Sequence, residues 1–165
     1  MLYRVKQFIW ALISMFKEVD NKLLDKYLSE DEKLLFNRLK KSEKYHCIRV
    51  CNDCLLASKG MDLDINKLAR IALLHDIGKI EGSLNIVEKS ILVIMNNLTG
   101  GGLINKCNKY KKVDLYYNHP QKGVDILKRI GIYDKEFLEV IEKHHLEEAY
   151  DNKYLSILKE CDDKN

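Results

Sequence analysis

The chain has 165 residues, a length that suits one domain with a buried core and leaves little room for a second domain. Hydrophobic residues make up 46% and charged residues 32%, which is the balance of a soluble globular protein. The net charge of +3 is too small to indicate a nucleic-acid partner by itself, and we expect none. A single proline and only eight glycines favour long helices with short connections.

The first predicted helix lies between Leu2 and Phe16, where apolar residues recur at helical spacing. Its apolar run, residues 8–16, is too short to span a membrane and is not followed by a signal-peptide cleavage site. We therefore expect no transmembrane segment and interpret these residues as an amphipathic helix packed on the domain. A peripheral membrane contact and a homodimer contact are the alternatives for this helix.

Helical periodicity continues along the chain, and no alternating strand pattern rises above noise. Ser29, Asp134 and either Asp64 or Asn66 are the expected N-caps. Gly60, Gly78 and Gly131 are expected to end helices, and Pro120 is expected to begin one. The predicted helices cover residues 21–28, 31–40, 42–59, 67–77, 86–98, 120–130, 135–146 and 152–161.

These elements predict an all-α fold, a compact helical bundle of about 7–8 helices. We expect one domain over residues 1–165, in which an N-terminal helical extension of about 40 residues packs on a core at about 42–162.

Five cysteines are present, an odd number that does not form the framework of a secreted protein. Cys47, Cys51 and Cys54 share one face of a predicted helix, where buried free thiols are common. We therefore expect a reducing, cytoplasmic location. A zinc site on Cys51 and Cys54 is a weaker alternative, because no second CxxC pair follows.

Four of the five histidines lie in three predicted helices, His119 lies directly before a fourth, and aspartates accompany them at positions 76 and 162. A helical bundle can build a metal site in its core from side chains on facing helices. Imidazole nitrogen and carboxylate oxygen suit Mn²⁺, Fe²⁺, Co²⁺ and Zn²⁺ without a thiolate. His75 and Asp76 are adjacent, so one helix end can supply two ligands to one ion. This pattern predicts a metal site but names no substrate.

Residues 70–79, with the sequence RIALLHDIGK, resemble the signature segment of the HD superfamily of metal-dependent phosphohydrolases in its HDIGK form. Four further segments resemble other motifs of this family in the expected order, and together they span residues 42–162. They are HCIRV at 46–50, NHPQKG at 118–123, IEKHH at 141–145 and LSILKECD at 155–162. The resemblance implies an all-α bundle of the HD-domain type.

The resemblance also implies roles for individual residues. The ligands of the first metal are expected to be His46, His75, Asp76 and Asp162, with Asp162 preferred to Asp163 by its place in the motif. The additional ligands of a second metal are expected to be His119 and His144, with His145 replacing or joining His144. The expected cofactor is one or two divalent ions of Mn, Fe, Co, Ni or Zn, with Mg as a further option.

Asp76 and Lys79 are the expected catalytic residues, Asp76 because it would bridge two ions. Lys79 and Lys122 are the candidates for binding a substrate phosphate, although Lys79 has the alternative of being a solvent-exposed lysine. Arg49 is expected to be structural and to pair with an acid near the site.

The implied activity is hydrolysis of a phosphate ester or anhydride in a nucleotide or related small molecule by a metal-activated water. Two alternatives stay open: a di-iron oxygenase on the same scaffold, and a non-catalytic sensor that binds a metal and a nucleotide. Residues 146–151 replace the GYP segment of the cyclic-dinucleotide subfamily, which argues against cyclic di-GMP as substrate. The insertion at 80–118 is interpreted as additional core, with a lid over the site as the alternative.

Overall fold

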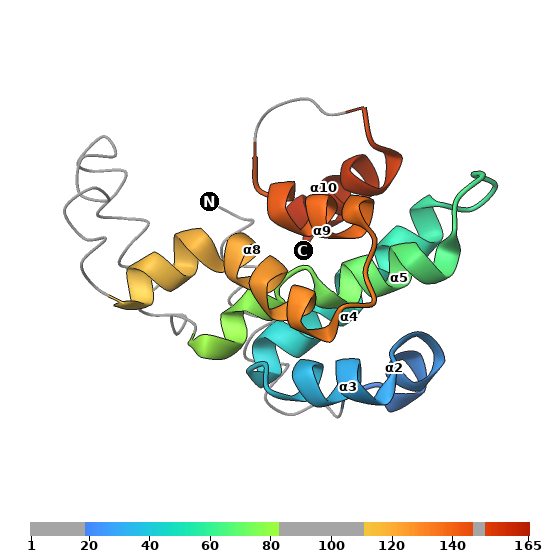
Figure 1. Ribbon diagram of the computed structural model, residues 1–165. Coiled ribbons are helices and arrows are strands. Elements are labelled where there is room, and N and C mark those ends of the chain that lie inside the picture. Colours follow the sequence, from blue (N-terminus) through green and yellow to red (C-terminus); the bar gives the residue numbers. More distant parts are fainter. Residues whose placement is uncertain (1–18, 83–110, 147–150) are drawn as a thin grey trace.

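The computed structural model describes residues 19–82, 111–146 and 151–165, and within these ranges the chain forms seven α-helices, one 3-10 helix and no strand. The helices pack as a bundle (Figure 1). The all-α prediction is therefore confirmed. The elements are α2 (Asn21–Tyr27), α3 (Glu30–Asn37), α4 (Lys41–Ala57), α5 (Ile65–Leu74), η1 (Ile77–Glu81), α8 (Lys111–Ile130), α9 (Lys135–Lys143) and α10 (Lys153–Lys164).

Short polar side chains begin the helices where the sequence indicates them. Ser29 and Glu32 form a reciprocal capping box at the start of α3. Asp64, rather than Asn66, caps α5, and Asp134 caps α9. Asn152 caps α10 through its side-chain oxygen. Each cap satisfies backbone N–H groups that would otherwise lack a partner in the first helical turn.

The end of α5 differs from the prediction. We expected this helix to continue to residue 77 and to stop at Gly78, but it ends at Leu74 and His75 is its C-cap residue. Gly78 instead lies inside η1, and Gly82, with a φ of 145°, follows η1. A Cβ atom on Gly78 would lie 1.9 Å from the carbonyl oxygen of His119, so this glycine serves close packing against α8.

Helix α8 also differs from the prediction, because Pro120 lies inside it and does not begin it. A proline within a helix removes one hydrogen bond and clashes with the preceding turn, at a cost of about 3 kcal/mol. Helix α8 packs extensively against η1, and this tertiary contact offsets the local cost. Pro120 itself is buried.

The core is formed around α5, which packs against α4, α9, α10 and α2. Leu68, Ile71 and Leu74 of α5 are fully buried. The α4 thiols of Cys47, Cys51 and Cys54 are buried and free, as predicted, and Cys161 of α10 is free and buried as well.

A buried carboxylate connects α3 to the rest of the bundle. The Glu32 Oε1 atom accepts hydrogen bonds from Arg70 Nε at 3.0 Å, Arg70 Nη2 at 2.8 Å and the Tyr133 hydroxyl at 2.9 Å. The Arg70 guanidinium also lies over the rings of Tyr133 and Phe137. Arg70, the first residue of the HDIGK-containing segment, is therefore a structural residue that joins α3, α5 and the start of α9.

Helices α2 and α3, which belong to the predicted N-terminal extension, pack against α5 and η1 respectively. The predicted helices at residues 2–16 and 86–98 lie outside the described residues. None of the described helices is long and apolar enough to cross a membrane.

We predict that Gly78→Ala lowers the free energy of unfolding by about 3 kcal/mol, the upper end of the usual cost of overpacking. The added methyl group would overlap the α8 backbone at His119 and Gly123, which cannot rotate away. Urea unfolding followed by circular dichroism measures this effect. The matched control is Gly123→Ala, whose Cβ would meet its nearest atom at 3.3 Å and should cost less. Equal stability of the two variants would contradict the close contact.

Candidate metal centre

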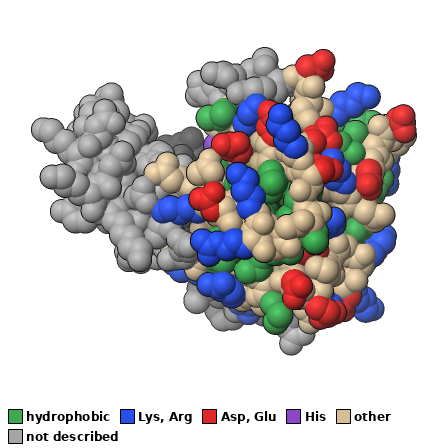
Figure 2. All heavy atoms as spheres, in the orientation of Figure 1, with side chains coloured by type: hydrophobic (Ala, Val, Ile, Leu, Met, Phe, Trp, Pro, Cys, Tyr) green, Lys and Arg blue, Asp and Glu red, His purple; other side chains and the backbone are tan. Residues whose placement is uncertain are grey.

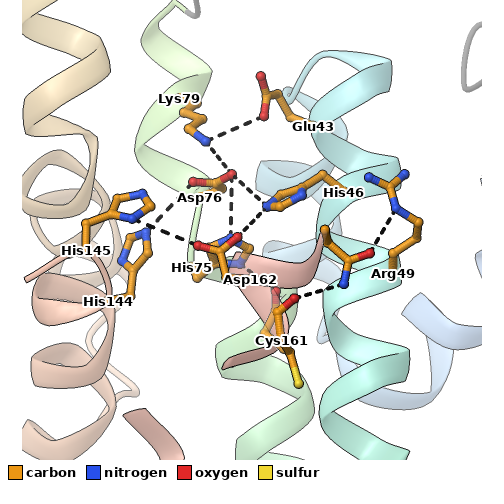
Figure 3. Close-up of polar contacts among 12 residues, drawn as sticks. Glu43, His46, Arg49, His75, Asp76, Lys79, His144, His145, Cys161 and Asp162 are labelled. Carbon is orange, nitrogen blue, oxygen red and sulfur yellow. Dashed lines mark hydrogen bonds and ion pairs between the residues drawn. The ribbon is translucent and has the colours of Figure 1, made fainter. Parts of the chain in front are cut away.

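The predicted ligands come together from five elements of the bundle (Figure 3). Helix α4 supplies one histidine, and the junction between α5 and η1 supplies the His-Asp pair. Helix α8 supplies one histidine, the C-terminal end of α9 supplies two, and α10 supplies an aspartate. The cluster contains His46, His75, Asp76, His119, His144, His145 and Asp162.

One group of ligand atoms consists of His46, His75 and Asp76, with Asp162 beside it. The Asp76 Oδ2 atom lies 3.7 Å from His46 Nε2 and 3.6 Å from His75 Nε2. The Asp162 Oδ1 atom lies 2.9 Å from His46 Nε2 and 3.6 Å from His75 Nε2. These four side chains are the set expected for the first metal.

A second group contains Asp76, His119, His144 and His145. The other carboxylate oxygen of Asp76, Oδ1, lies 3.1 Å from His119 Nε2 and 4.0 Å from His144 Nε2. The two groups therefore share Asp76 and approach different oxygens of its carboxylate. The structure brings both His144 and His145 to this group, and the choice between them as ligand stays a prediction.

Two of the histidines are oriented by the backbone of their own helices. His75 Nδ1 lies 2.8 Å from the carbonyl oxygen of Ala72, and His144 Nδ1 lies 2.6 Å from that of Ile141. These carbonyls can accept a hydrogen bond only from a protonated Nδ1, so Nε2 is the atom left for a metal.

Buried polar atoms without hydrogen-bond partners indicate whether these residues fit a metal ion. The Nε2 atoms of His75 and His144 are buried, and neither has a hydrogen-bond partner among the described residues. Buried polar atoms without partners are costly and rare in folded proteins. Nitrogen and oxygen donors without thiolate are the set that Mn, Fe, Co, Ni and Zn accept. The residues fit a divalent metal.

Both aspartates of the cluster are held in their ionised form. Burial alone raises the pKa of a carboxyl group, but Lys79 and His75 hold the pKa of Asp76 well below its usual range. Burial also raises the pKa of the Asp162 carboxyl, but His46 and His75 outweigh this effect and hold the pKa below its usual range. The site thus offers two carboxylates to a cation at any ordinary pH.

The pKa values of His75, His144 and His145 are shifted in opposite directions. Burial lowers the pKa of His75, but Asp76 and Asp162 outweigh it and raise this pKa to about 9. Burial lowers the pKa of His144 well below its usual range, and it lowers the pKa of His145 to about 4 with the help of His119. In the metal-free protein at neutral pH, His75 carries a proton whereas His144 and His145 do not.

The alternative of a solvent-exposed lysine is wrong for Lys79, because its side chain is only 12% exposed. Its Nζ atom donates a hydrogen bond to Asp76 Oδ2 at 2.5 Å and lies 3.6 Å from Glu43 Oε2. Sequence reasoning missed Glu43. Its position three residues before His46, one turn away on the same helix, is the signal that indicates it.

Two other basic residues were singled out from the sequence. Arg49 Nε donates to Asn165 Oδ1 at 3.2 Å, and Asn165 Nδ2 donates to Asp53 at 2.7 Å and to the Cys161 carbonyl at 2.9 Å. The buried Asn165 amide, which sequence reasoning missed, thereby joins α4 to the end of α10 that carries Asp162. Lys122 is half-buried on α8, three residues after His119, and its phosphate-binding role stays a prediction.

An open groove of about 410 Å³ lies elsewhere, between α3, η1 and the end of α8. It is lined by Leu34, Leu35, Ile126 and Ile130 together with charged residues such as Arg38 and Arg129. It shares no residue with the ligand cluster.

Comparison with known proteins gives one match. The family model of the HD domain matches residues 44–164, which include every member of the ligand cluster. No curated protein and no solved structure matches the chain. Members of the matched family typically are metal-dependent hydrolases. The matched segment covers most of the chain and contains the buried histidine–aspartate cluster, and the protein is therefore a member of the HD domain family.

Proposed function

We propose that this protein hydrolyses a phosphate ester or anhydride in a nucleotide or related small molecule, with a metal-bound water as the nucleophile. The observation that carries the proposal is the sharing of Asp76 between two groups of histidines. A carboxylate between two ligand groups is suited to hold two ions side by side, and paired ions are a recurrent device of phosphoester hydrolysis.

The proposed cofactor is a pair of divalent ions of Mn, Fe, Co, Ni or Zn. When bound, such ions lower the pKa of a bound water and polarise a phosphoryl oxygen. His46, His75, Asp76 and Asp162 would hold one ion. The set of His119, His144 and His145 would hold the other together with Asp76.

The exposure of the ligands indicates the side from which a substrate enters. His75, Asp76, His119 and His144 are buried, whereas the side chains of His46, Asp162 and His145 are 18%, 11% and 49% exposed. Histidine is visible only as a small purple spot on the face in Figure 2. The mouth of the proposed site therefore lies between α4, the end of α9 and α10. Substrate phosphate would meet Lys79 close to this mouth, where its ammonium can donate to phosphoryl oxygens.

A small-molecule substrate is preferred to nucleic acid. On the face shown in Figure 2, basic and acidic side chains are interspersed and form no continuous basic surface over the described residues. Nucleic-acid binding usually depends on such a basic surface. The four described cysteines are free, which supports the proposal of a reducing cytoplasm.

We predict that purified protein loaded with Mn²⁺, Co²⁺ or Fe²⁺ hydrolyses a generic phosphoester, and that Asp162→Asn lowers kcat/KM by more than about 100-fold. This loss should exceed the 10–100-fold effect of outer-shell residues, because Asp162 is a proposed ligand. His75→Ala should abolish the activity. A metal panel with a chromogenic phosphoester measures these effects.

The matched control is Asp163→Asn, which removes the same charge from the exposed neighbouring position. It should keep activity within about twofold of the wild type, since exposed substitutions away from a site have small effects. Equal loss in the two variants, or a wild type inert across metals and a broad phosphate panel, would contradict the proposed function.

We predict that the affinity for Zn²⁺ rises with pH between 7.5 and 9 and levels off above the His75 pKa of about 9. A metal ligand must be unprotonated, so binding displaces the proton from His75 below that pKa. One displaced proton weakens apparent affinity by about tenfold per pH unit on the acid side. Asp76, Asp162, His144 and His145 contribute nothing in this range, because they are already in their metal-binding forms.

Titration against a competing chelator of known proton affinity measures this dependence. His75→Asn, which carries no displaceable proton at this position, should show a weaker and flatter profile. An unchanged slope in that variant would contradict the assignment of the proton to His75.

A further inference from the structure

A carboxylate outside the ligand groups lies close to Lys79. Glu43 is in the first turn of α4, and its side chain is only 7% exposed. Its Oε2 atom lies 3.6 Å from Lys79 Nζ, and both Glu43 and His46 approach from α4 (Figure 3). The lysine thus lies between two carboxylates, Asp76 and Glu43, that come from different elements.

The two carboxylates differ in the groups that compete for their oxygens. Asp76 Oδ2 accepts the Lys79 hydrogen bond and also faces the Nε2 atoms of His46 and His75. A cation held by Asp76 therefore competes with the Lys79 ammonium for the same oxygen and repels it. Glu43 is in none of the candidate ligand groups, so a cation held by those groups would not take its carboxylate away from the ammonium.

The place of Glu43 in the helix helps to keep it ionised. The N-terminal turn of a helix stabilises a negative charge by the helix dipole. Glu43 is the acidic residue in the first turn of α4. This position favours a negatively charged side chain beside the Lys79 ammonium.

We propose that Glu43 is a positioning residue, which holds the Lys79 ammonium at the mouth of the site when Asp76 is engaged with metal and so directs it to the substrate phosphate. This inference rests on the proposed function. An ammonium has three N–H donors. With one of them kept by Glu43, the others are free for phosphoryl oxygens, whereas a lysine without this anchor would be displaced from the site.

Inorganic phosphate binding to Mn²⁺-loaded protein, measured by isothermal titration calorimetry, tests the proposal without requiring turnover. We expect Glu43→Gln and Lys79→Met each to weaken phosphate binding by about tenfold, a typical loss for one charge-assisted hydrogen bond. The double variant should be no weaker than Lys79→Met, because Glu43 acts through the lysine. Mn²⁺ affinity, titrated separately, should stay within threefold of wild type, on the order of 0.6 kcal/mol, in Glu43→Gln.

The matched control is Glu30→Gln, which removes a first-turn glutamate that pairs with Lys33 on α3, far along the chain from the site. It should leave phosphate binding unchanged. Wild-type phosphate affinity in Glu43→Gln, or additive losses in the double variant, would overturn the positioning role. A large loss of Mn²⁺ affinity in Glu43→Gln would overturn it as well, since Glu43 would then act on the metal.

A second measurement separates this inference from the proposed function. Acetic anhydride labels accessible lysine amines, and mass spectrometry reads the extent at Lys79. We expect Lys79 of the Mn²⁺-loaded wild type to be protected and that of Glu43→Gln to be labelled several-fold faster. Equal labelling would overturn the Glu43–Lys79 contact even if phosphate binds. Normal protection in a protein that binds Mn²⁺ but no phosphate would overturn the proposed function and the phosphate-directing role, and would leave only the contact.

Discussion

The carboxylate of Asp76 is fully buried, and its neighbours hold it in the ionised form. Such a charge is stable only when cations or hydrogen-bond donors surround it. Lys79 donates to one oxygen from η1, and His119 of α8 approaches the other. His46 and His75 face the first oxygen from α4 and α5. The packing of these four elements and the arrangement of the site residues therefore both depend on the Asp76 carboxylate.

A close backbone contact between η1 and α8 allows His119 to approach Asp76. η1 and α8 approach so closely at Gly78, His119 and Gly123 that no Cβ atom fits at Gly78. The approach brings His119 within 3.1 Å of Asp76. The positions of the HDIGK segment thus have separate physical roles. His75 and Asp76 belong to the candidate ligand groups, Ile77 is buried in the core, Gly78 permits the helix contact and Lys79 donates a hydrogen bond to the Asp76 carboxylate.

The features that sequence reasoning predicted are the local ones. Ser29, Asp64 and Asp134 cap helices because a short polar side chain reaches backbone N–H groups two or three residues ahead, which requires no knowledge of the fold. The all-α class followed in the same way from apolar spacing. The histidine–aspartate set followed from motif order, and the structure brings all its members together.

The features that it missed depend on contacts between distant parts of the chain. As a glycine, Gly78 is predicted to end a helix. Its role is instead set by the α8 backbone, which is distant in sequence and packs against it. Pro120 has the signal of a helix start, and packing of α8 on η1 tolerates it inside the helix. Glu43 looks like an ordinary first-turn glutamate until Lys79 is placed beside it. The local sequence limits the roles that a residue can have, and its tertiary contacts determine which of these roles it has in the fold.

The same distinction explains why a metal site of this kind identifies the chemistry better than the substrate. Imidazole and carboxylate atoms that converge on an ion are turned inward, so they contact the transferred group and little else of the molecule that carries it. Selection among phosphate compounds must come from side chains at the mouth. His145 is the most exposed member of the cluster, and Lys79 is a cation beside Asp76 that belongs to none of the candidate ligand groups. Under the proposed function, discrimination between substrates would therefore depend on side chains around the candidate ligand groups and not on the ligands themselves.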